Sequence, residues 1–362
     1  MNLLVVILML WVVCLLTACL HHYAVCSQTC AGKMLHPGLH LDCALHTTRS
    51  WKGEDLALLP LLLRVASRPG RFVELGAYTG VDFSNTLILE KCFNWTGLLI
   101  EANSDNFAQL EHSGRSAVLK HSAICAGQGR QGETTNITKA GGAVAGQVES
   151  MSARFVATQR RGDDLTQETV PCQSLTSLVK QSFPVTSPID FLSLDVEGAE
   201  YEVLKHAHPR MFSVVLVETE GGSVEKNEAV HSLLLSSGLV LSREVRVPSS
   251  SVYVRPELQL TPSHARPFLP PALLIPGAQP GYCAETREGQ RGDCDAGERG
   301  SWRISRFRKF NVSSCVHRCR WECKRCRYVS VSLQTNDCSW YSSCDLQQLK
   351  DAGMDHQSLP VF

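Results

Sequence analysis

The sequence predicts an α/β fold built on a mostly parallel sheet, followed by a small disulfide-rich C-terminal module. From Trp51 onward, short apolar runs alternate with helical stretches, a pattern typical of a parallel sheet covered by helices on both faces. The second observation is that eight of the 16 cysteines follow residue 282. Disulfides commonly replace the core that a small domain lacks, so this segment is expected to fold separately.

The expected strands are the apolar runs between the helical stretches. One helix, Leu56–Ala66, ends before the stop signal Arg68-Pro69-Gly70. A last, antiparallel strand is expected at 251–254. The parallel strands are expected at 71–75, 98–100, 117–124, 189–194 and 214–217.

Composition and the N-terminus indicate the compartment. A formal net charge of zero gives no support to nucleic-acid binding, so no nucleic-acid partner is expected. Leu3–Leu20 carries no charge, which favours a signal anchor at 1–20 over a cleaved signal peptide ending near Val25-Cys26-Ser27. We therefore expect a single-pass type II membrane protein of the ER or Golgi lumen, or a secreted protein if the signal is cleaved. Three glycosylation sequons, at Asn94, Asn136 and Asn311, agree with this location.

Composition also divides the chain. Residues 256–280 hold seven prolines, as expected for a semi-rigid linker. The segment Gly127–Asp164 is polar and glycine-rich, and it predicts either a lid over a substrate or a mobile insertion. The expected parts are an anchor at 1–20, a lumenal stem at 21–50, the α/β domain at 51–256, a linker at 257–280, the cysteine-rich module at 281–346 and a tail at 347–362.

A glycine turn after the first strand indicates a cofactor pocket. In Phe72-Val73-Glu74-Leu75-Gly76-Ala77-Tyr78-Thr79-Gly80, a strand enters a turn that Gly76 and Gly80 allow to pass close beneath a ligand. The pattern is E-x-G-x-x-x-G and lacks the third glycine of a dinucleotide site. Glu101, 21 residues after Gly80, ends the second strand and can accept hydrogen bonds from both hydroxyls of a ribose.

Two longer segments resemble the FkbM methyltransferases. One runs from Val73 through Ser84-Asn85-Thr86 to Trp95-Thr96-Gly97-Leu98-Leu99-Ile100-Glu101, and the other is Ile189 to Glu200, around Asp195-Val196-Glu197-Gly198. The similarity spans about residues 70–255. It implies a class I methyltransferase fold, Rossmann-like and seven-stranded with one antiparallel strand. It also implies S-adenosylmethionine (AdoMet) as cofactor and O-methylation of a hydroxyl, often on a sugar. Glu74, Gly76, Gly80 and Glu101 match the cofactor positions, and Asp195 and Glu197 match the acidic motif after the fourth strand.

The acids fit this chemistry. A sugar hydroxyl must lose its proton to attack, so a carboxylate or a metal-bound oxygen can assist; a divalent metal stays open. Asp195 and Glu197 are the candidate catalytic residues, with Glu218 and Glu220 as weaker candidates. Glu200 is expected to satisfy the dipole of the following helix.

The cysteines of the C-terminal module favour four disulfides over a zinc site, although Cys315, Cys319, Cys323 and Cys326 follow C-x3-C-x3-C-x2-C. Eight cysteines allow 105 pairings, so the connectivity stays open. A further disulfide, Cys125–Cys172, is predicted because both residues are expected at the same end of the sheet, where the bridge would close the base of the long insertion.

Three functions follow from these observations. The first is a lumenal AdoMet-dependent O-methyltransferase with a glycan or glycoprotein acceptor. The second is a non-catalytic role, because the anchor, Asn94-Trp95-Thr96-Gly97 and the lumenal cysteines also resemble Star-type membrane proteins, which assist the trafficking of secreted ligands. The third is a glycan-binding protein with a vestigial methyltransferase domain, suggested by the basic and aromatic residues of the module.

Overall fold

The expected anchor, most of the expected stem and Asn311 lie outside the residues that the structure describes. Among the described residues, no helix is both long and apolar enough to cross a membrane. The computed structural model describes residues 39–66, 69–125, 133–139, 145–146, 166–183, 188–219, 223–259, 273, 275, 277–287, 290–303, 312–333, 335, 337–350 and 356–361.

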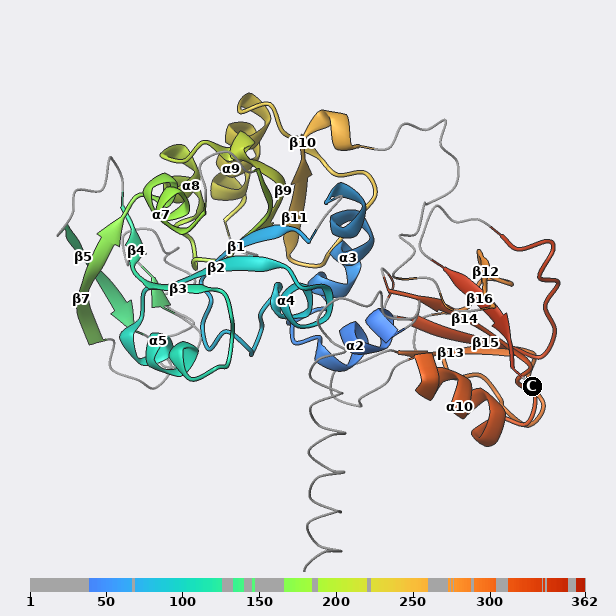
Figure 1. The fold of residues 1–362 in the computed structure, drawn as a ribbon. Helices are drawn as coiled ribbons and strands as arrows, with labels where there is room; N and C mark the ends of the chain where they lie inside the picture. Colours follow the sequence, from blue (N-terminus) through green and yellow to red (C-terminus); the bar gives the residue numbers. More distant parts are fainter. Residues whose placement is uncertain are drawn as a thin grey trace, which may run out of the picture.

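A seven-stranded sheet forms the centre of the larger domain (Figure 1). Its order is β10-β11-β9-β8-β1-β2-β3, and only β11 runs against its neighbours. The predicted class I methyltransferase sheet, mostly parallel with one antiparallel strand, is confirmed. The strands are β1 (Arg71–Leu75), β2 (Thr96–Glu101), β3 (Val118–His121), β8 (Ile189–Leu194), β9 (Phe212–Glu218), β10 (Val240–Leu241) and β11 (Ser250–Val254).

Helices cover both faces of this sheet, as the near-continuous apolar strands require. Successive residues of β1 belong to two different hydrophobic clusters: Phe72 packs on one face and Val73 on the other. The helices are α2 (Leu39–Thr47), α3 (Glu54–Val65), α4 (Leu87–Phe93), α5 (Ser104–Glu111), α7 (Leu175–Ser182), α8 (Glu200–Lys205) and α9 (Val224–Ser236), with 3-10 turns η2 (Pro209–Met211) and η3 (Pro256–Leu258).

Helix α2 lies in the segment expected to be a solvated stem. Leu41, Ala44 and Leu45 of this helix are buried, and a disulfide joins Cys43 to Cys92 of α4, with Cα atoms 5.7 Å apart. The folded domain therefore begins before Trp51. Residues 39–47 are too few, and too rich in histidine, for their apolar pattern to stand out in the sequence.

A four-stranded sheet of order β4-β7-β5-β6 adjoins the cavity end of the domain. The expected strand 117–124 is divided between β3 and β4, and part of the segment expected as a polar loop forms β5. Its alternating threonines and isoleucine suit a strand, and Ile137 and Val170 are buried between β5 and β7. These strands are β4 (Ala123–Ile124), β5 (Thr134–Lys139), β6 (Ala145–Gly146) and β7 (Thr166–Gln173).

The C-terminal module is a five-stranded antiparallel sheet of order β12-β16-β14-β15-β13, with α10 (Val312–Glu322) beside it. Strand β12 lies in the expected linker and β16 in the expected tail, so the module is longer than 281–346. All eight cysteines pair within it: Cys283–Cys344, Cys294–Cys323, Cys315–Cys338 and Cys319–Cys326. The strands are β12 (Gln279–Pro280), β13 (Arg299–Arg303), β14 (Tyr328–Ser332), β15 (Asp337–Tyr341) and β16 (Gln357–Pro360).

A buried arginine connects the β1–α4 loop to α4. The fully buried guanidinium of Arg115 donates from Nε to Glu90 Oε2 at 2.8 Å and from Nη1 to the carbonyl oxygen of Gly80 at 2.6 Å. It also lies 3.9 Å from Glu74 Oε2. Burial, the largest single influence, would raise the pKa of Glu90, but the charge and hydrogen bond of Arg115, together with hydrogen bonds from Ser116, lower that pKa. One cation thus keeps a buried carboxylate charged.

Replacing Arg115 with leucine is expected to lower the free energy of unfolding by about 3–5 kcal/mol, because it leaves buried carboxyls without their cation. The Glu90 pKa is depressed in the folded state, so its contribution is present above the ordinary glutamate value of 4.5 and is lost as pH falls through the folded value. The difference in free energy of unfolding between wild type and Arg115→Leu should therefore become smaller below about pH 4.5, as measured by denaturant titration.

Arg64→Leu is the matched control, since Arg64 bonds Glu244 at 2.7 Å with both side chains about one-fifth exposed. We expect a loss of about 1 kcal/mol there. Equal losses in the two variants would contradict a central role for Arg115.

Candidate functional site

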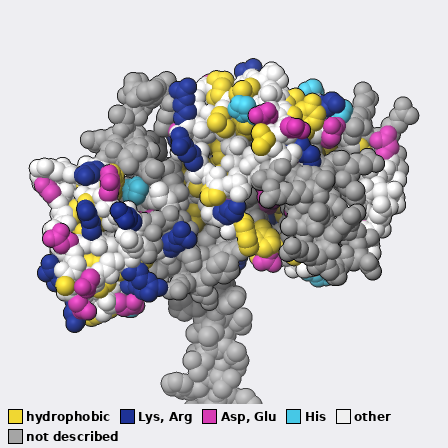
Figure 2. All heavy atoms as spheres, turned by 180° about the vertical axis from the view of Figure 1, so that it is seen from behind, with side chains coloured by type: hydrophobic (Ala, Val, Ile, Leu, Met, Phe, Trp, Pro, Cys, Tyr) yellow, Lys and Arg dark blue, Asp and Glu magenta, His cyan; other side chains and the backbone are white. Residues whose placement is uncertain are grey.

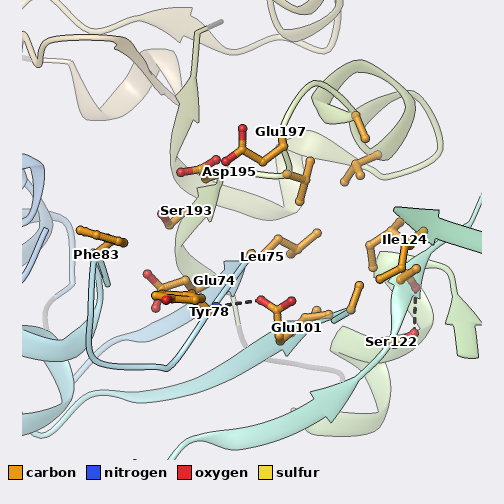
Figure 3. Close-up of a pocket in the computed structure, with 18 of the residues that line it drawn as sticks. Glu74, Leu75, Tyr78, Phe83, Glu101, Ser122, Ile124, Ser193, Asp195 and Glu197 are labelled. Atoms are coloured by element: carbon orange, nitrogen blue, oxygen red, sulfur yellow. Dashed lines mark hydrogen bonds between the residues drawn. The ribbon is translucent and has the colours of Figure 1, made fainter. Parts of the chain in front are cut away.

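A cavity of about 940 Å³, its open mouth included, lies at the carboxyl ends of β1, β2 and β8 (Figure 3). This is the edge at which ligands bind in open α/β sheets. Four acids and several apolar side chains line it together. The lining residues are Glu74, Leu75, Gly76, Tyr78, Phe83, Asn85, Ile100, Glu101, Ala102, Ser122, Ala123, Ile124, Ile137, Ser193, Asp195, Val196, Glu197, Ala199 and Val203.

Gly76 forms the floor of the cavity where β1 turns. Its φ is +75°, and the amide N–H groups of Gly76 and Ala77 both donate to the carbonyl oxygen of Ile100 at 3.1 Å. A Cβ at this position would collide with the backbone oxygen of Asp195. Only glycine lets the turns after β1 and β8 approach so closely.

Gly80, expected at the cofactor, does not line the cavity. Its φ is +74°, and a Cβ there would collide with Leu110 of α5. Its carbonyl oxygen accepts from Arg115. The structure therefore places Gly80 where α5 packs on the loop, behind the turn that Gly76 forms.

Glu74 lines the cavity, but its oxygens already accept several hydrogen bonds. Oε2 accepts from the hydroxyls of Ser84 at 2.8 Å and Thr86 at 2.6 Å, and Oε1 accepts from the amide of Asn85 at 2.7 Å. Burial raises the pKa of Glu74 despite Arg115 and these donors. The carboxyl thus ties the loop before α4 to β1, a positioning role beside the ligand-binding role expected from the sequence.

Glu101 lies at the opposite side of the cavity, where Figure 3 shows it bonded to the Tyr78 backbone. Its Oε2 accepts the Tyr78 N–H and its Oε1 accepts the Asn103 N–H, both at 2.8 Å. The backbone of Ala102 and the side chain of Asn106 also hydrogen-bond to this carboxyl. Burial raises the pKa of Glu101, and any ligand hydroxyl would meet an oriented carboxyl at this point.

Asn85 is a cavity residue that the sequence analysis did not single out. Its Nδ2 donates to Ser193 Oγ at 3.1 Å, while its buried Oδ1 has no hydrogen-bond partner among the described residues. A buried acceptor without a donor is costly and calls for a ligand or water. An ammonium group such as that of AdoMet fits it.

The acids after β8 and β9 meet at the cavity. The carboxylate oxygens of Asp195, Glu197 and Glu218 all lie within 4.8 Å of one another, and Figure 3 shows Asp195 and Glu197 side by side. Desolvation, and then the charge of Glu218, raise the pKa of Asp195 well above its usual value. Glu197 has a left-handed backbone, with φ of 53°. Such a set can hold a proton or a hard cation.

Two further acids lie near this cluster in the sequence. Glu200 accepts the N–H groups of Val196 at 3.2 Å and Gly198 at 3.0 Å, which agrees with the expected role at the start of α8. Glu220 lies outside the described residues. Sequence reasoning alone could not show that Glu218 meets Asp195, because only the spatial pairing of β8 with β9 brings the two residues together.

Aromatic side chains form the rim near Asp195. Phe83 stacks on Tyr78 with ring centroids 5.9 Å apart, and Trp51 meets Phe83 edge-on at 5.2 Å. Trp51 is 61% exposed. Tyr78 and Phe83 both have positive φ, of 48° and 63°, although neither is glycine. Strained backbone of this kind gathers at ligand sites.

The remaining predicted positions lie away from the acids. Cys125 and Cys172 form a disulfide with Cα atoms 5.5 Å apart, beneath the four-stranded sheet. Asn94 is exposed just before β2, at the opposite strand end from Glu101. Asn136 is exposed on β5, and its Oδ1 accepts from Thr169 at 2.7 Å.

Comparison with known proteins gives a match to one family over part of the chain. Residues 74–235 match the family model of the methyltransferase FkbM domain. No curated protein matches the chain.

Solved structures give distant matches. The ribosomal protein L11 methylase of Lactobacillus delbrueckii subsp. bulgaricus is 10% identical, covering 55% of this chain and 74% of that one, with a TM-score of 0.30. TrmK of M. capricolum, solved with S-adenosyl-homocysteine, is 11% identical, covering 58% and 68%, with a TM-score of 0.31. The sugar N-methyltransferase KedS8 of Streptoalloteichus sp. ATCC 53650 is 10% identical, covering 56% and 86%, with a TM-score of 0.31. Similarity at this level supports no conclusion about the substrate.

Gly76→Ala is expected to weaken AdoMet binding at least about tenfold, because the added Cβ forces apart the turns that carry Gly76 and Asp195. Calorimetry on the purified folded chain measures this. Gly114→Ala is the matched control: Gly114 also has positive φ, of 69°, but nothing lies within 4 Å of its Cβ position. It should lose about 1 kcal/mol of stability and keep its affinity. Unchanged affinity in Gly76→Ala would remove the turn from the cofactor site.

Proposed function

We propose that this chain, whose residues 74–235 carry an FkbM methyltransferase domain, transfers a methyl group from AdoMet to a hydroxyl of a glycan in the secretory pathway. The observation that carries the proposal is the partly exposed acid cluster of Asp195, Glu197 and Glu218, which opens on the same cavity as the Gly76 turn. The carboxylates of this cluster and the Gly76 turn of the proposed cofactor site therefore lie at one cavity, which an acceptor can enter.

The cavity residues fit AdoMet from one end to the other. Ile124 and Ile137 offer an apolar wall for the adenine, and Glu101 offers carboxylate oxygens to the ribose hydroxyls. The Gly76 turn and Asn85 Oδ1 are placed for the amino acid part. When bound, AdoMet supplies a methyl group activated by its positively charged sulfur.

The protein's part in the reaction is to orient the acceptor and take its proton. AdoMet would supply the methyl group to the acceptor oxygen and would leave as S-adenosyl-homocysteine. The hydroxyl proton passes to a carboxylate oxygen of Asp195. Methyl transfer is an in-line displacement, so holding the oxygen in line contributes much of the rate.

The rim supports a sugar acceptor. Phe83 lines the same cavity as Asp195, and the exposed Trp51 packs edge-on against Phe83. Aromatic faces pack well against the apolar face of a sugar ring. An acceptor lying on this rim would direct a hydroxyl towards Asp195.

A divalent cation is a second way to activate the hydroxyl at the same place. Asp195, Glu197 and Glu218 offer three carboxylates, which are the ligands that Mg²⁺ and Ca²⁺ prefer. These residues would hold the ion, which lowers the pKa of a bound hydroxyl. Activity that is lost on chelation and restored by Mg²⁺ or Mn²⁺ would support the cation; activity that survives chelation would support the carboxylate alone.

The proposed location is supported by cysteine pairing. Among the described residues, two disulfides lie within the α/β domain and four within the C-terminal module. Disulfides persist in oxidising compartments. The uncharged segment Leu3–Leu20 and the sequons point to the same compartment.

Expression of the full chain in a secretory host, followed by fractionation and transfer of labelled methyl from AdoMet to a panel of glycans, tests location and activity together. Tight AdoMet binding without transfer to any glycan would favour the non-catalytic alternative.

Asp195→Asn keeps the shape of the side chain and removes its charge. We expect methyl transfer to fall by about 10²–10⁴-fold, the usual contribution of a positioned base, while AdoMet affinity stays within about threefold. Asp345→Asn in the C-terminal module is the matched control and should retain full activity. Wild-type turnover in Asp195→Asn would make Asp195 a structural residue.

Asn94 is expected to carry a glycan that leaves AdoMet binding intact, since it lies at the far end of β2 from Glu101, on the order of 15 Å away. Glycosidase treatment and mass spectrometry of protein from a secretory host detect the glycan, and calorimetry on Asn94→Gln measures the cofactor. An unmodified Asn94 peptide would argue against lumenal exposure. Loss of AdoMet binding in folded Asn94→Gln would contradict the separation of the two edges.

A further inference from the structure

We propose that a segment outside the matched methyltransferase domain, residues 48–52, forms the acceptor subsite at the mouth of the cavity, and that a neutral sugar ring stacks on Trp51. The inference rests on the proposed function and names the part of the chain that recognises the acceptor. The family match begins at residue 74, so this segment belongs to the region that precedes it. Asp55 is the positioning residue that holds the segment in place.

One side of the segment is attached to the wall of the cavity. Ser50 pairs with Phe83 in an isolated parallel bridge, and Phe83 lines the same cavity as Asp195. The indole of Trp51, the next residue, contacts the Phe83 ring, with ring centroids 5.2 Å apart and planes at 82° to each other. Backbone pairing and ring contact together place Trp51 at the cavity mouth.

The other side of the segment reaches the strand that carries part of the acid cluster. Nζ of Lys52 donates to Oγ of Ser249, directly before β11. The carbonyl oxygen of Ser249 accepts the N–H of Thr219 at 2.9 Å, and Thr219 follows Glu218 of the acid cluster. Trp51 therefore lies between one residue fixed to the cavity wall and another fixed beside the acids.

A buried aspartate holds the segment. Asp55, in the first turn of α3, is 1% exposed and accepts from the hydroxyls of Thr48 at 2.8 Å and Ser50 at 2.7 Å. On the other side of the segment, the disulfide Cys43–Cys92 joins α2 to α4. The indole therefore projects from a backbone that is already fixed, which lowers the entropy cost of binding a ligand.

The exposed rings and their polar neighbours suit a sugar. Trp51 is 61% exposed and Phe83 is 37% exposed. Two perpendicular rings form a corner, which can hold the apolar C–H face of a sugar against one ring and its edge against the other. The sugar hydroxyls then meet the polar groups beside the corner. A wholly apolar ligand would bury those groups without partners, and the acid cluster would repel an anionic ring.

The back of the molecule offers no comparable surface for a large charged acceptor. Figure 2 shows lysine, arginine and acidic side chains interspersed over the described parts of both the α/β domain and the C-terminal module on that face. Charges of both signs that alternate in this way create little net field to attract a polyanion. Recognition through the aromatic corner needs no such field.

The first experiment detects a sugar at Trp51 without requiring turnover. The full chain is labelled with 5-fluorotryptophan, the Trp51 signal is identified from its absence in Trp51→Phe, and the probes are methyl glycosides of glucose, galactose, mannose, xylose and fucose. At millimolar concentration, at least one glycoside should shift the fluorine signal of Trp51. The signal of Trp321, which is 69% exposed on α10, should not move. Equal shifts of both signals, or no shift of the Trp51 signal with any glycoside, overturn the inference.

The second experiment separates acceptor recognition from catalysis. With a glycoside that accepts methyl, Trp51→Ala should raise the acceptor KM about tenfold, and Trp51→Phe about threefold because the smaller ring keeps part of the contact. Both should keep kcat and AdoMet affinity within about twofold, and Trp321→Ala should match wild type. An unchanged acceptor KM in Trp51→Ala contradicts the inference. A shifted Trp51 signal without methyl transfer to the same glycoside counts against the proposed function and leaves the sugar subsite standing.

The positioning role of Asp55 is tested by three variants whose folding is checked by near-ultraviolet circular dichroism. Asp55→Leu removes the acceptor of both hydroxyls and should raise the acceptor KM about tenfold without weakening AdoMet binding. Asp55→Asn keeps an acceptor oxygen and should return the KM to within about threefold of wild type. Ser50→Ala, a milder change, should raise it about threefold. An unchanged acceptor KM in Ser50→Ala and in folded Asp55→Leu, or an equal loss of AdoMet affinity, removes Asp55 from the subsite.

Discussion

The cofactor end of this fold depends on one buried cation. Arg115 reaches Glu90 on α4, the carbonyl oxygen of Gly80 and the hydroxyl of Thr86, and it lies beside Glu74. Two carboxyls buried at the end of β1 and the start of α4 would otherwise be strongly destabilising. Glu74 in turn accepts hydrogen bonds from the residues before α4. The position of the Arg115 guanidinium therefore determines the path of the loop from Gly76 onward. The loop can therefore be rigid before any ligand arrives, which lowers the cost of binding.

That dependence marks the limit of what the sequence could predict. Periodicity and a glycine turn were sufficient for most of the sheet and for Glu101, because these signals are local, whereas Asp195 was singled out by the resemblance to the FkbM methyltransferases. Arg115 follows Glu90 by 25 residues in a stretch with no motif, and its role arises only when α5 and β3 return to the sheet. Asn85 stands in a segment that resembles the FkbM family, but the sequence gives it no role, since its buried oxygen lacks a hydrogen-bond partner only as a result of packing. Strand β16 was missed for a related reason. It has only four residues, and its pairing with a neighbouring strand stabilises it.

Strain is concentrated where the protein would act. Five non-glycine residues in the described part of the chain have positive φ, and three of them, Tyr78, Phe83 and Glu197, line the cavity. Each conformation costs on the order of 1–3 kcal/mol and must be held by its surroundings. The Tyr78 amide is held by Glu101, and the segment after Phe83 is held by Glu74. The buried acids thus keep the aromatic rim in place, and the raised pKa values of Glu74 and Glu101 reflect the desolvation that this arrangement costs.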